Sequence, residues 1–205
     1  MPLVYAALVP HSPLLIPTIG KENRSLIEVT VSSLETIKRA LGVVHPDVIA
    51  VISPHGTIRS HIQGFVSERY KTDFRRFGDL TYSEEFPSSY LFLVQLKKRA
   101  RKFHFSLVTE SMLDYGAGVP LTLIQNPLEE QFAVSPIRTS NANKVVHFQF
   151  GSLLSEEIAS TDKRVALLAS GECSHCHRSP ELGEESKSYD HSLIQSIKNR
   201  DIESF

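Results

Sequence analysis

The sequence predicts an α/β fold: a single-domain sandwich in which helices cover both faces of a mixed, mostly parallel central sheet. Short apolar runs alternate along the chain with longer segments whose apolar positions repeat with a helical period. Three of the short runs, at residues 3–9, 47–52 and 164–169, are apolar on both faces, as strands buried between layers of helices are. A chain of 205 residues is long enough for a sizeable core. We therefore expect residues 1–205 to form one domain.

The elements of the first half follow from apolar spacing and from proline and glycine. The first strand, residues 3–9, ends at Pro10, where a loop begins. Residues 21–41 carry apolar side chains close to one stripe, which predicts an amphipathic helix, and Gly42 is placed to cap it. Residues 84–102 predict a second helix, because their acidic start and basic end match the helix macrodipole. The other expected elements are strands at 47–52 and 63–68 and a loop at 69–82.

The second half shows the same alternation. The glycines of residues 113–118 predict a loop. In chain order, the pattern predicts a strand at 103–109, this loop, a short helix at 119–124, a strand at 130–134, a helix at 140–158, a strand at 164–169 and a last helix at 181–199.

Composition excludes several classes of protein. The 22 Lys and Arg side chains are balanced by 23 Asp and Glu, which argues against a nucleic-acid or anionic-membrane surface. The chain has no apolar stretch near the ~20 residues of a membrane span and no basic region of a signal peptide at its start. We expect a soluble, cytoplasmic protein. Cys173 and Cys176 lie too close in sequence to build a disulfide framework.

Three histidines follow the three apolar strands. His11 comes after residues 3–9, His55 after 47–52, and His175 follows 164–169 in a glycine-containing loop. If these strands are parallel neighbours, the three imidazoles converge at the carboxyl ends of the strands, where open α/β sheets bind ligands. Imidazole is the most frequent metal ligand and the usual proton carrier near neutral pH. The pattern therefore predicts a metal site or an acid–base site.

Four motifs in order carry a resemblance to a known family. They are ALVPHSPLL near the N-terminus, VISPHG, LDYGAGVPL at 113–121 and LLASGECSH at 167–175. Together they resemble the subunit-B type of the class III extradiol ring-cleavage dioxygenases, including the relatives associated with AMMECR1 proteins and the Memo proteins. The resemblance implies a non-haem Fe(II)-dependent enzyme that cleaves a catechol-like aromatic ring with O₂. Such chemistry requires Fe(II) with open positions, usually on two histidines and one carboxylate.

The resemblance also implies roles for individual residues. His11 and His55 would be metal ligands, and His175 the catalytic acid/base. Asp114 and Tyr115 would contact the substrate, although the family commonly has D-H-G where this chain has Asp114-Tyr115-Gly116. Tyr115 donates a hydrogen bond but does not accept a proton at neutral pH as imidazole does. Glu172 would support the site from outside the set of metal ligands.

The third metal ligand of the family is missing from these motifs. In the family it is a Glu, or a Cys in Memo-like members, from a segment beyond the helix that here ends near residue 199, so we expect an impaired metal site in this chain. None of the available carboxylates sits in the ligand motif; they are Glu172, Glu184, Glu185 and Glu203. The pair Cys173-x-x-Cys176 would suit zinc or redox chemistry, but local packing is the simpler interpretation because no second cysteine pair exists.

Three functions remain open on the sequence. The first is an extradiol-type dioxygenase that acts on a catechol-like substrate with O₂. The second is a Memo-like protein that binds metal or a protein partner without ring cleavage, and the third is a zinc hydrolase built on the same histidines. Fe(II) is the expected metal, with Zn as the alternative. A homo-oligomer or a partner subunit is compatible with all three.

Overall fold

The computed structural model of the chain describes residues 2–125, 132–174 and 180–201. The chain divides into two compact units, Met1–Gly171 and Glu172–Phe205. The first contains the central sheet and the second contains α6 (Pro180–Asn199). Within the described residues, none of the helices combines the length and the apolar character needed to cross a membrane.

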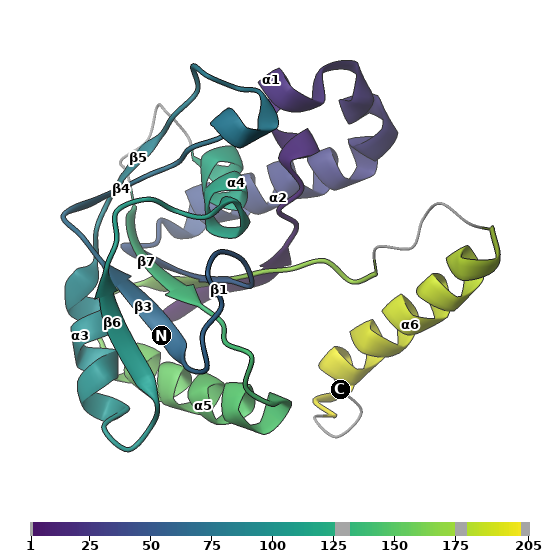
Figure 1. Ribbon diagram of the computed structural model, residues 1–205. Coiled ribbons are helices and arrows are strands. Elements are labelled where there is room, and N and C mark those ends of the chain that lie inside the picture. Colours follow the sequence, from purple (N-terminus) through teal and green to yellow (C-terminus); the bar gives the residue numbers. More distant parts are fainter. Residues whose placement is uncertain (1, 126–131, 175–179, 202–205) are drawn as a thin grey trace. The chain divides into compact units, whose positions relative to one another are not determined.

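The first unit is organised around a mixed sheet of six strands (Figure 1). The first four strands in the sheet are parallel neighbours, whereas the fifth runs antiparallel to the fourth and parallel to the sixth. In sheet order the strands are β1 (Leu3–Val9), β8 (Val165–Ser170), β2 (Val48–Ser53), β7 (Ala133–Arg138), β3 (Ile62–Val66) and β6 (Phe105–Thr109). A separate antiparallel pair is formed by β4 (Arg69–Lys71) and β5 (Glu85–Pro87).

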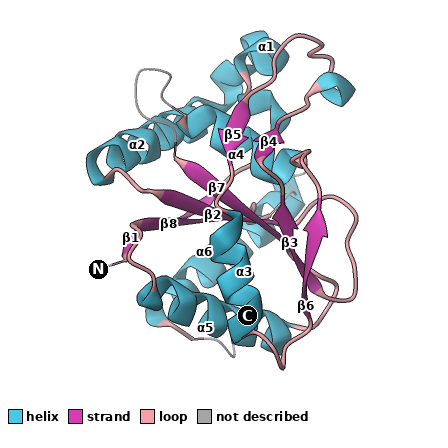
Figure 2. Ribbon diagram, turned by 90° about the vertical axis from the view of Figure 1, so that its left-hand side faces the viewer, coloured by secondary structure: helices cyan, strands magenta, loops and turns pink. Residues whose placement is uncertain are grey.

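Helices cover both faces of this sheet (Figure 2). One face is covered by α2 (Glu28–Val44) and α4 (Tyr115–Ile124), the other by α3 (Tyr90–Arg99) and α5 (Lys144–Ser160). The expected fold class, a mostly parallel sheet between helices, is therefore confirmed. Short helical turns complete the N-terminal region and one loop: α1 (Pro17–Gly20) and the 3₁₀ turns Pro13–Leu15, Lys21–Ile27 and Arg75–Phe77.

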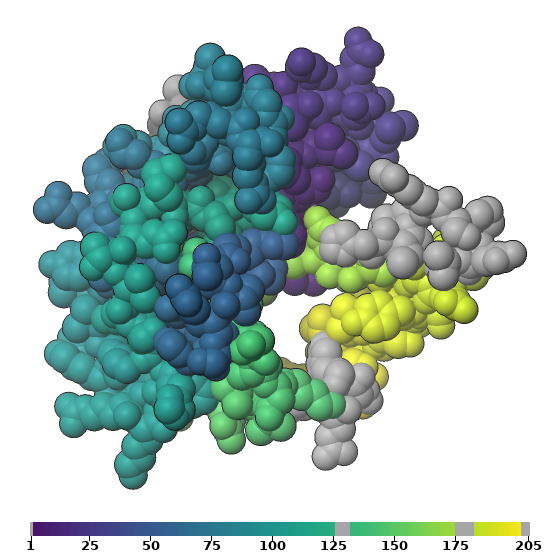
Figure 3. All heavy atoms as spheres, in the orientation of Figure 1, coloured from purple at the N-terminus to yellow at the C-terminus, as the bar shows by residue number. Residues whose placement is uncertain are grey.

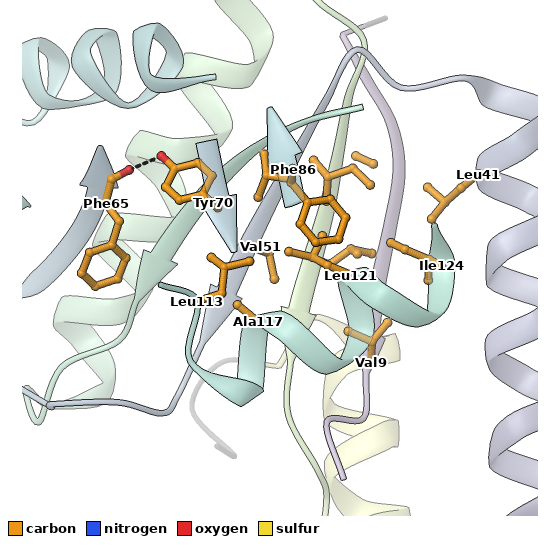
Figure 4. Packing of buried hydrophobic residues seen from close by; sticks show 14 residues of the cluster. Val9, Leu41, Val51, Phe65, Tyr70, Phe86, Leu113, Ala117, Leu121 and Ile124 are labelled. Carbon is orange, nitrogen blue, oxygen red and sulfur yellow. Dashed lines mark hydrogen bonds between the residues drawn. The ribbon is translucent and has the colours of Figure 1, made fainter. Parts of the chain in front are cut away.

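The core lies on both sides of the central strand β2. Ile49 and Val51 face α4, while Val48 and Ala50 face the opposite side, and all four are buried. Figure 4 shows Val51 near Leu113 and Ala117 of the same cluster. Each fully buried Val or Ile side chain contributes about 1.5–3 kcal/mol to the free energy of unfolding. An apolar run without alternation therefore specifies a strand covered on both faces.

Two predicted helices have different boundaries in the structure. The expected helix at 21–41 begins as a 3₁₀ turn, and α2 continues to Val44, so Gly42 lies inside the helix and does not cap it. His45 ends the helix instead, in the left-handed conformation with φ of 43°. The expected helix at 84–102 is wrong at its start: Pro87 disfavours helical geometry in the residue before it, and Glu85–Pro87 forms β5.

The loop predicted at 113–118 is largely helical. Helix α4 begins at Tyr115, because the Asp114 side chain accepts a hydrogen bond from the backbone N–H of Ala117 and caps the helix. The glycines are tolerated because the helix is buried in the core. The strand expected at 130–134 is β7, which extends to Arg138; residues 126–131 lie outside the described part of the chain.

The N-terminal segment and the loop between β4 and β5 lie side by side. Figure 3 shows the purple N-terminal segment next to the blue-teal atoms of that loop. The hydroxyl of Thr18 donates a hydrogen bond to Asp79, which also accepts from the backbone N–H groups of Thr81 and Tyr82. These bonds hold the pKa of Asp79 at about 2, with the Thr18 bond as the largest cause.

Candidate functional site

The candidate site lies where the four parallel strands end. Register pairs Val9 of β1 with Ser170 of β8, and Ser53 of β2 with Arg138 of β7, so these strands end at the same level. Side chains alternate along a strand, and Ser53, Ser170 and Arg138 therefore share the face on which Val51 and Leu168 contact α4. The first turn of α4 contacts this edge, since Ser170 Oγ donates to the backbone oxygen of Gly116 at 2.5 Å.

His11 and His55 meet at this edge. His11 follows β1, is only 5% exposed, and its Nε2 lies 2.8 Å from Nε2 of His55. Their rings are 4.5 Å apart and nearly perpendicular, with an interplanar angle of 81°. The structure thus brings together two of the three histidines that follow apolar strands. His175 lies outside the described residues.

The hydrogen bond of His11 to Ser170 selects its tautomer. Nδ1 of His11 lies 3.0 Å from Ser170 Oγ. Because the Ser170 hydroxyl donates its hydrogen to Gly116, it accepts from the Nδ1–H of His11. Nε2 then carries the lone pair and points toward His55. Metal-binding histidines are oriented in this way by a partner on the other ring nitrogen.

The hydrogen bond between His55 and its partner Tyr115 can run in either direction. The Tyr115 hydroxyl lies 3.0 Å from His55 Nδ1, and the two rings stack with centroids 4.2 Å apart. If Nδ1–H donates to Tyr115, both histidines present lone pairs across 2.8 Å, an arrangement that requires a cation between them. Without a cation, Nε2–H of His55 donates to His11, and the tyrosine hydroxyl donates to Nδ1. The histidine pair is therefore compatible with both the cation-bound and the cation-free state.

The geometry of the two nitrogens fits a metal ion. With bonds of about 2.0–2.1 Å, two nitrogen ligands at a right angle lie about 2.9 Å apart, and in a tetrahedral site about 3.4 Å. The 2.8 Å between the Nε2 atoms of His11 and His55 is closer to the right-angle value, which suits two adjacent positions of an octahedral ion. Within the described part of the chain, no group of three His, Cys, Asp or Glu side chains is placed to hold a metal. The histidine pair therefore supplies two ligands.

Asp114 connects the His55 loop with α4. Its Oδ1 accepts from Ser53 Oγ at 2.5 Å and from the backbone N–H of Ala117 at 3.2 Å. Ser53 Oγ in turn accepts from the backbone N–H of His55 at 3.2 Å. Asp114 Oδ2 lies 3.5 Å from Nη2 of Arg138. Direct contact of Asp114 with a substrate stays a prediction.

A cavity of about 230 Å³ adjoins Tyr115. The guanidinium carbon of Arg76 lies 4.4 Å from the Tyr115 ring, whose neighbour His55 belongs to the histidine pair. The cavity therefore combines apolar side chains and a tyrosine with one cation and two carboxylates; it is lined by Asp73, Arg76, Met112, Leu113, Asp114 and Tyr115.

The residues of the second unit are described by themselves. Burial raises the pKa of the Cys173 thiol, and the carboxylate of Asp190 raises it further. A raised pKa lowers the thiolate fraction that metal or redox chemistry needs. Glu184 pairs with Lys187 at 2.7 Å, and Glu185 is exposed. A supporting role for Glu172 stays a prediction, and Cys176 and Glu203 lie outside the described residues.

Three polar residues of the site were not predicted. Ser53 and Ser170 are the last residues of β2 and β8, and a polar side chain that ends a buried apolar run is the signal that could have found them. Arg138 ends β7 in the same way, but that strand was expected to end at residue 134. These three side chains hold the histidine loops and α4 together.

Comparison with known proteins agrees with the motifs. The model of the family described as the catalytic LigB subunit of aromatic ring-opening dioxygenase matches residues 5–205. A relative in Clostridium acetobutylicum, named Protein CA_C1420, is 23% identical over 222 residues. The alignment covers 96% of this chain but 45% of the relative, so the chain spans less than half of that protein.

Proposed function

Because the chain belongs to the family of the catalytic LigB subunit of aromatic ring-opening dioxygenases, we propose that it is an extradiol-type dioxygenase. The proposed reaction cleaves the ring of a catechol-like substrate with O₂ at a non-haem Fe(II) site. The observation that carries the proposal is the His11–His55 pair, whose Nε2 atoms are 2.8 Å apart while each Nδ1 has a hydrogen-bonding partner. When bound, Fe(II) offers adjacent open positions for the catecholate and for O₂.

The residues of the chain have distinct roles in this proposal. His11 and His55 would hold the metal through Nε2, and Ser170 keeps Nδ1 of His11 protonated. With a metal bound, His55 would present its Nε2 lone pair and donate Nδ1–H to the Tyr115 oxygen. Tyr115, which lines the adjoining cavity, would contact the substrate, as the family motif implies. His175 takes and returns the protons of the catechol hydroxyls, as the family motif implies.

The first experiment measures metal content and reaction together. The chain is loaded anaerobically with Fe(II), the bound iron is counted, and O₂ uptake and ring-opened product are followed with a panel of catechols. Because the described residues place only two ligands together, we expect weak iron binding and slow O₂ uptake, matched by ring-opened product, for at least one catechol. Iron bound at the histidines without O₂ uptake would refute the dioxygenase and leave a metal-binding protein, as in the Memo-like alternative. Activity with Zn(II) on a hydrolysable substrate would favour the hydrolase.

Single histidine variants separate the roles. His11→Ala and His55→Ala are expected to lose the metal, whereas His175→Ala should keep the metal and lose turnover. His104→Ala is the matched control, because His104 is exposed and follows α3 away from the pair. Equal loss of metal in His175→Ala and His55→Ala would contradict the acid/base role. For the third ligand, Glu172→Gln is the first substitution to examine.

A further inference from the structure

Arg138 is a buried cation at the end of β7. Its side chain is only 6% exposed, and Nη2 lies 3.5 Å from Oδ2 of Asp114 and 3.7 Å from Oε1 of Glu110. The Asp114 side chain is itself 9% exposed. Burial of a guanidinium is costly unless acidic groups compensate its charge. The position of Arg138 and the positions of its acidic partners therefore depend on one another.

The guanidinium is packed against an aromatic ring and against a glycine. Its central carbon lies 4.2 Å from the centroid of the Phe65 ring. The backbone of Gly56 approaches so closely that a Cβ there would lie 2.5–2.6 Å from the guanidinium atoms. Gly56 also has φ of 88°, which favours glycine. The backbone directly after His55 therefore rests on Arg138.

The same side chain reaches His55 by a second route. Asp114 accepts from Ser53 Oγ at 2.5 Å, and Ser53 Oγ accepts from the backbone N–H of His55 at 3.2 Å. A backbone hydrogen bond joins the ends of β7 and β2 as well, because the N–H of Thr139 donates to the backbone oxygen of Ser53 at 2.9 Å. Arg138 thus contacts the His55 loop directly through Gly56 and indirectly through Asp114 and Ser53.

Asp114 also joins Arg138 to α4. The capping bond to Ala117 fixes the first turn of this helix, which carries Tyr115, the hydrogen-bonding partner of His55 Nδ1. Both groups that set the position of the His55 ring, its loop and its tyrosine partner, are therefore tied to one guanidinium.

We infer that Arg138 is a positioning residue of the site: paired with Asp114 and packed against Gly56, it holds the His55 loop and the first turn of α4 in one arrangement. Its consequence for a metal-dependent reaction rests on the proposed function. The anchoring itself belongs to the metal-free chain, and it is tested there first. A guanidinium suits this place because it presents a flat group to Gly56 and a positive charge to Asp114 at once.

The test compares three variants of the 205-residue chain. Arg138→Met keeps the length and apolar stem but removes the charge and the planar group, and Arg138→Lys restores the charge alone. Arg99→Met is the matched control, because Arg99 also pairs with a buried carboxylate, Glu157 at 3.0 Å, between α3 and α5 on the other face of the sheet. Any general effect of breaking an ion pair appears in the control.

The first readout is amide hydrogen exchange in the metal-free protein, followed by NMR. Arg138→Met should accelerate exchange of the His55 and Ala117 amides about tenfold or more relative to Arg99→Met, and Arg138→Lys should lie between the two. The second readout is Co(II) affinity by calorimetry, expected to fall about 10–100-fold in Arg138→Met and to stay unchanged in Arg99→Met, as for other groups that orient a metal ligand.

Each outcome decides the inference. If Arg138→Met lowers stability as the control does but leaves both amides and Co(II) affinity at wild-type values, Arg138 has a structural role only and the inference is overturned. If Arg138→Met does not fold, Asp114→Asn and Arg138→Lys are compared by the same exchange measurement, and unchanged exchange in both overturns it. If the wild-type chain binds no metal, the proposed function fails, while the exchange data still decide the role of Arg138.

Discussion

Gly116→Ala should destabilise the protein although alanine is the better helix former. Gly116 is the second residue of α4, and an alanine in a helix is favoured over glycine by about 1 kcal/mol. At this position, however, a Cβ would overlap Ser53 Oγ and lie 3.0 Å from both Asp114 Oδ1 and His55 Cδ2. The side chain of Ser53 has to move, and its bond to Asp114 is then lost.

The loss of stability follows from two destabilising contributions and one stabilising contribution. Overpacking by one methyl group in a rigid environment costs about 1–3 kcal/mol. A hydrogen bond to a charged group contributes about 1.5–3 kcal/mol, and that contribution is lost when Ser53 leaves Asp114. The helix propensity of alanine offsets about 1 kcal/mol of this loss. We expect the free energy of unfolding to fall by about 1.5–5 kcal/mol.

The assay is urea denaturation, in which the stability of Gly116→Ala is compared with that of Gly151→Ala. Gly151 is an exposed residue inside α5, and a Cβ there would meet no atom within 4 Å. That variant should be stabilised by about 0.5–1 kcal/mol, so the two glycine-to-alanine changes should have opposite signs. If Gly116→Ala is as stable as wild type, or gains as much as Gly151→Ala, then the contact between α4 and the Ser53–Asp114 bond is not as close as described.

Two further predictions concern Ser170 and Asp79. Ser170→Ala removes the acceptor of His11 Nδ1–H, so metal affinity measured by calorimetry should fall about 10–100-fold, and unchanged affinity would show that Ser170 does not select the tautomer. The pKa of Asp79 is lowered to about 2, below the value of about 3.9 in an unfolded chain. Its contribution to stability is therefore complete above pH 4 and is lost as the pH falls toward 2. The melting temperature of the wild type should fall more steeply over that range than that of Asp79→Asn, and parallel profiles would contradict the assignment.

The parts of the fold that the sequence predicted well are those specified by local composition. The strands predicted at 3–9, 47–52 and 164–169 correspond to β1, β2 and β8 to within one residue. A short run of apolar side chains, ended by proline or serine, carries enough information for a buried strand. Because these strands are parallel neighbours, the positions of His11 and His55 at one edge of the sheet followed from the same pattern.

The parts that the sequence did not predict depend on contacts between distant segments. Gly116 and Gly118 indicated a loop, but the cap by Asp114 and burial of the helix outweigh their low helix propensity. Arg138 has no local signal for its role, since its partners Asp114 and Phe65 lie far away in the sequence. Such a buried ion pair becomes visible only when the strand order is known.

The contacts of α4 explain how loops can hold a precise pair of ligands. His11 and His55 both follow strands, and each is bound to the first turn of α4 by a different route. Ser170 bonds to His11 and to the backbone oxygen of Gly116, while Tyr115 bonds to His55 directly. That turn is fixed in its own place by its cap and by the burial of Ala117 and Leu121 against the sheet. One helix turn therefore contributes to the positions of both histidines, so substitutions that displace this turn should affect both histidines together.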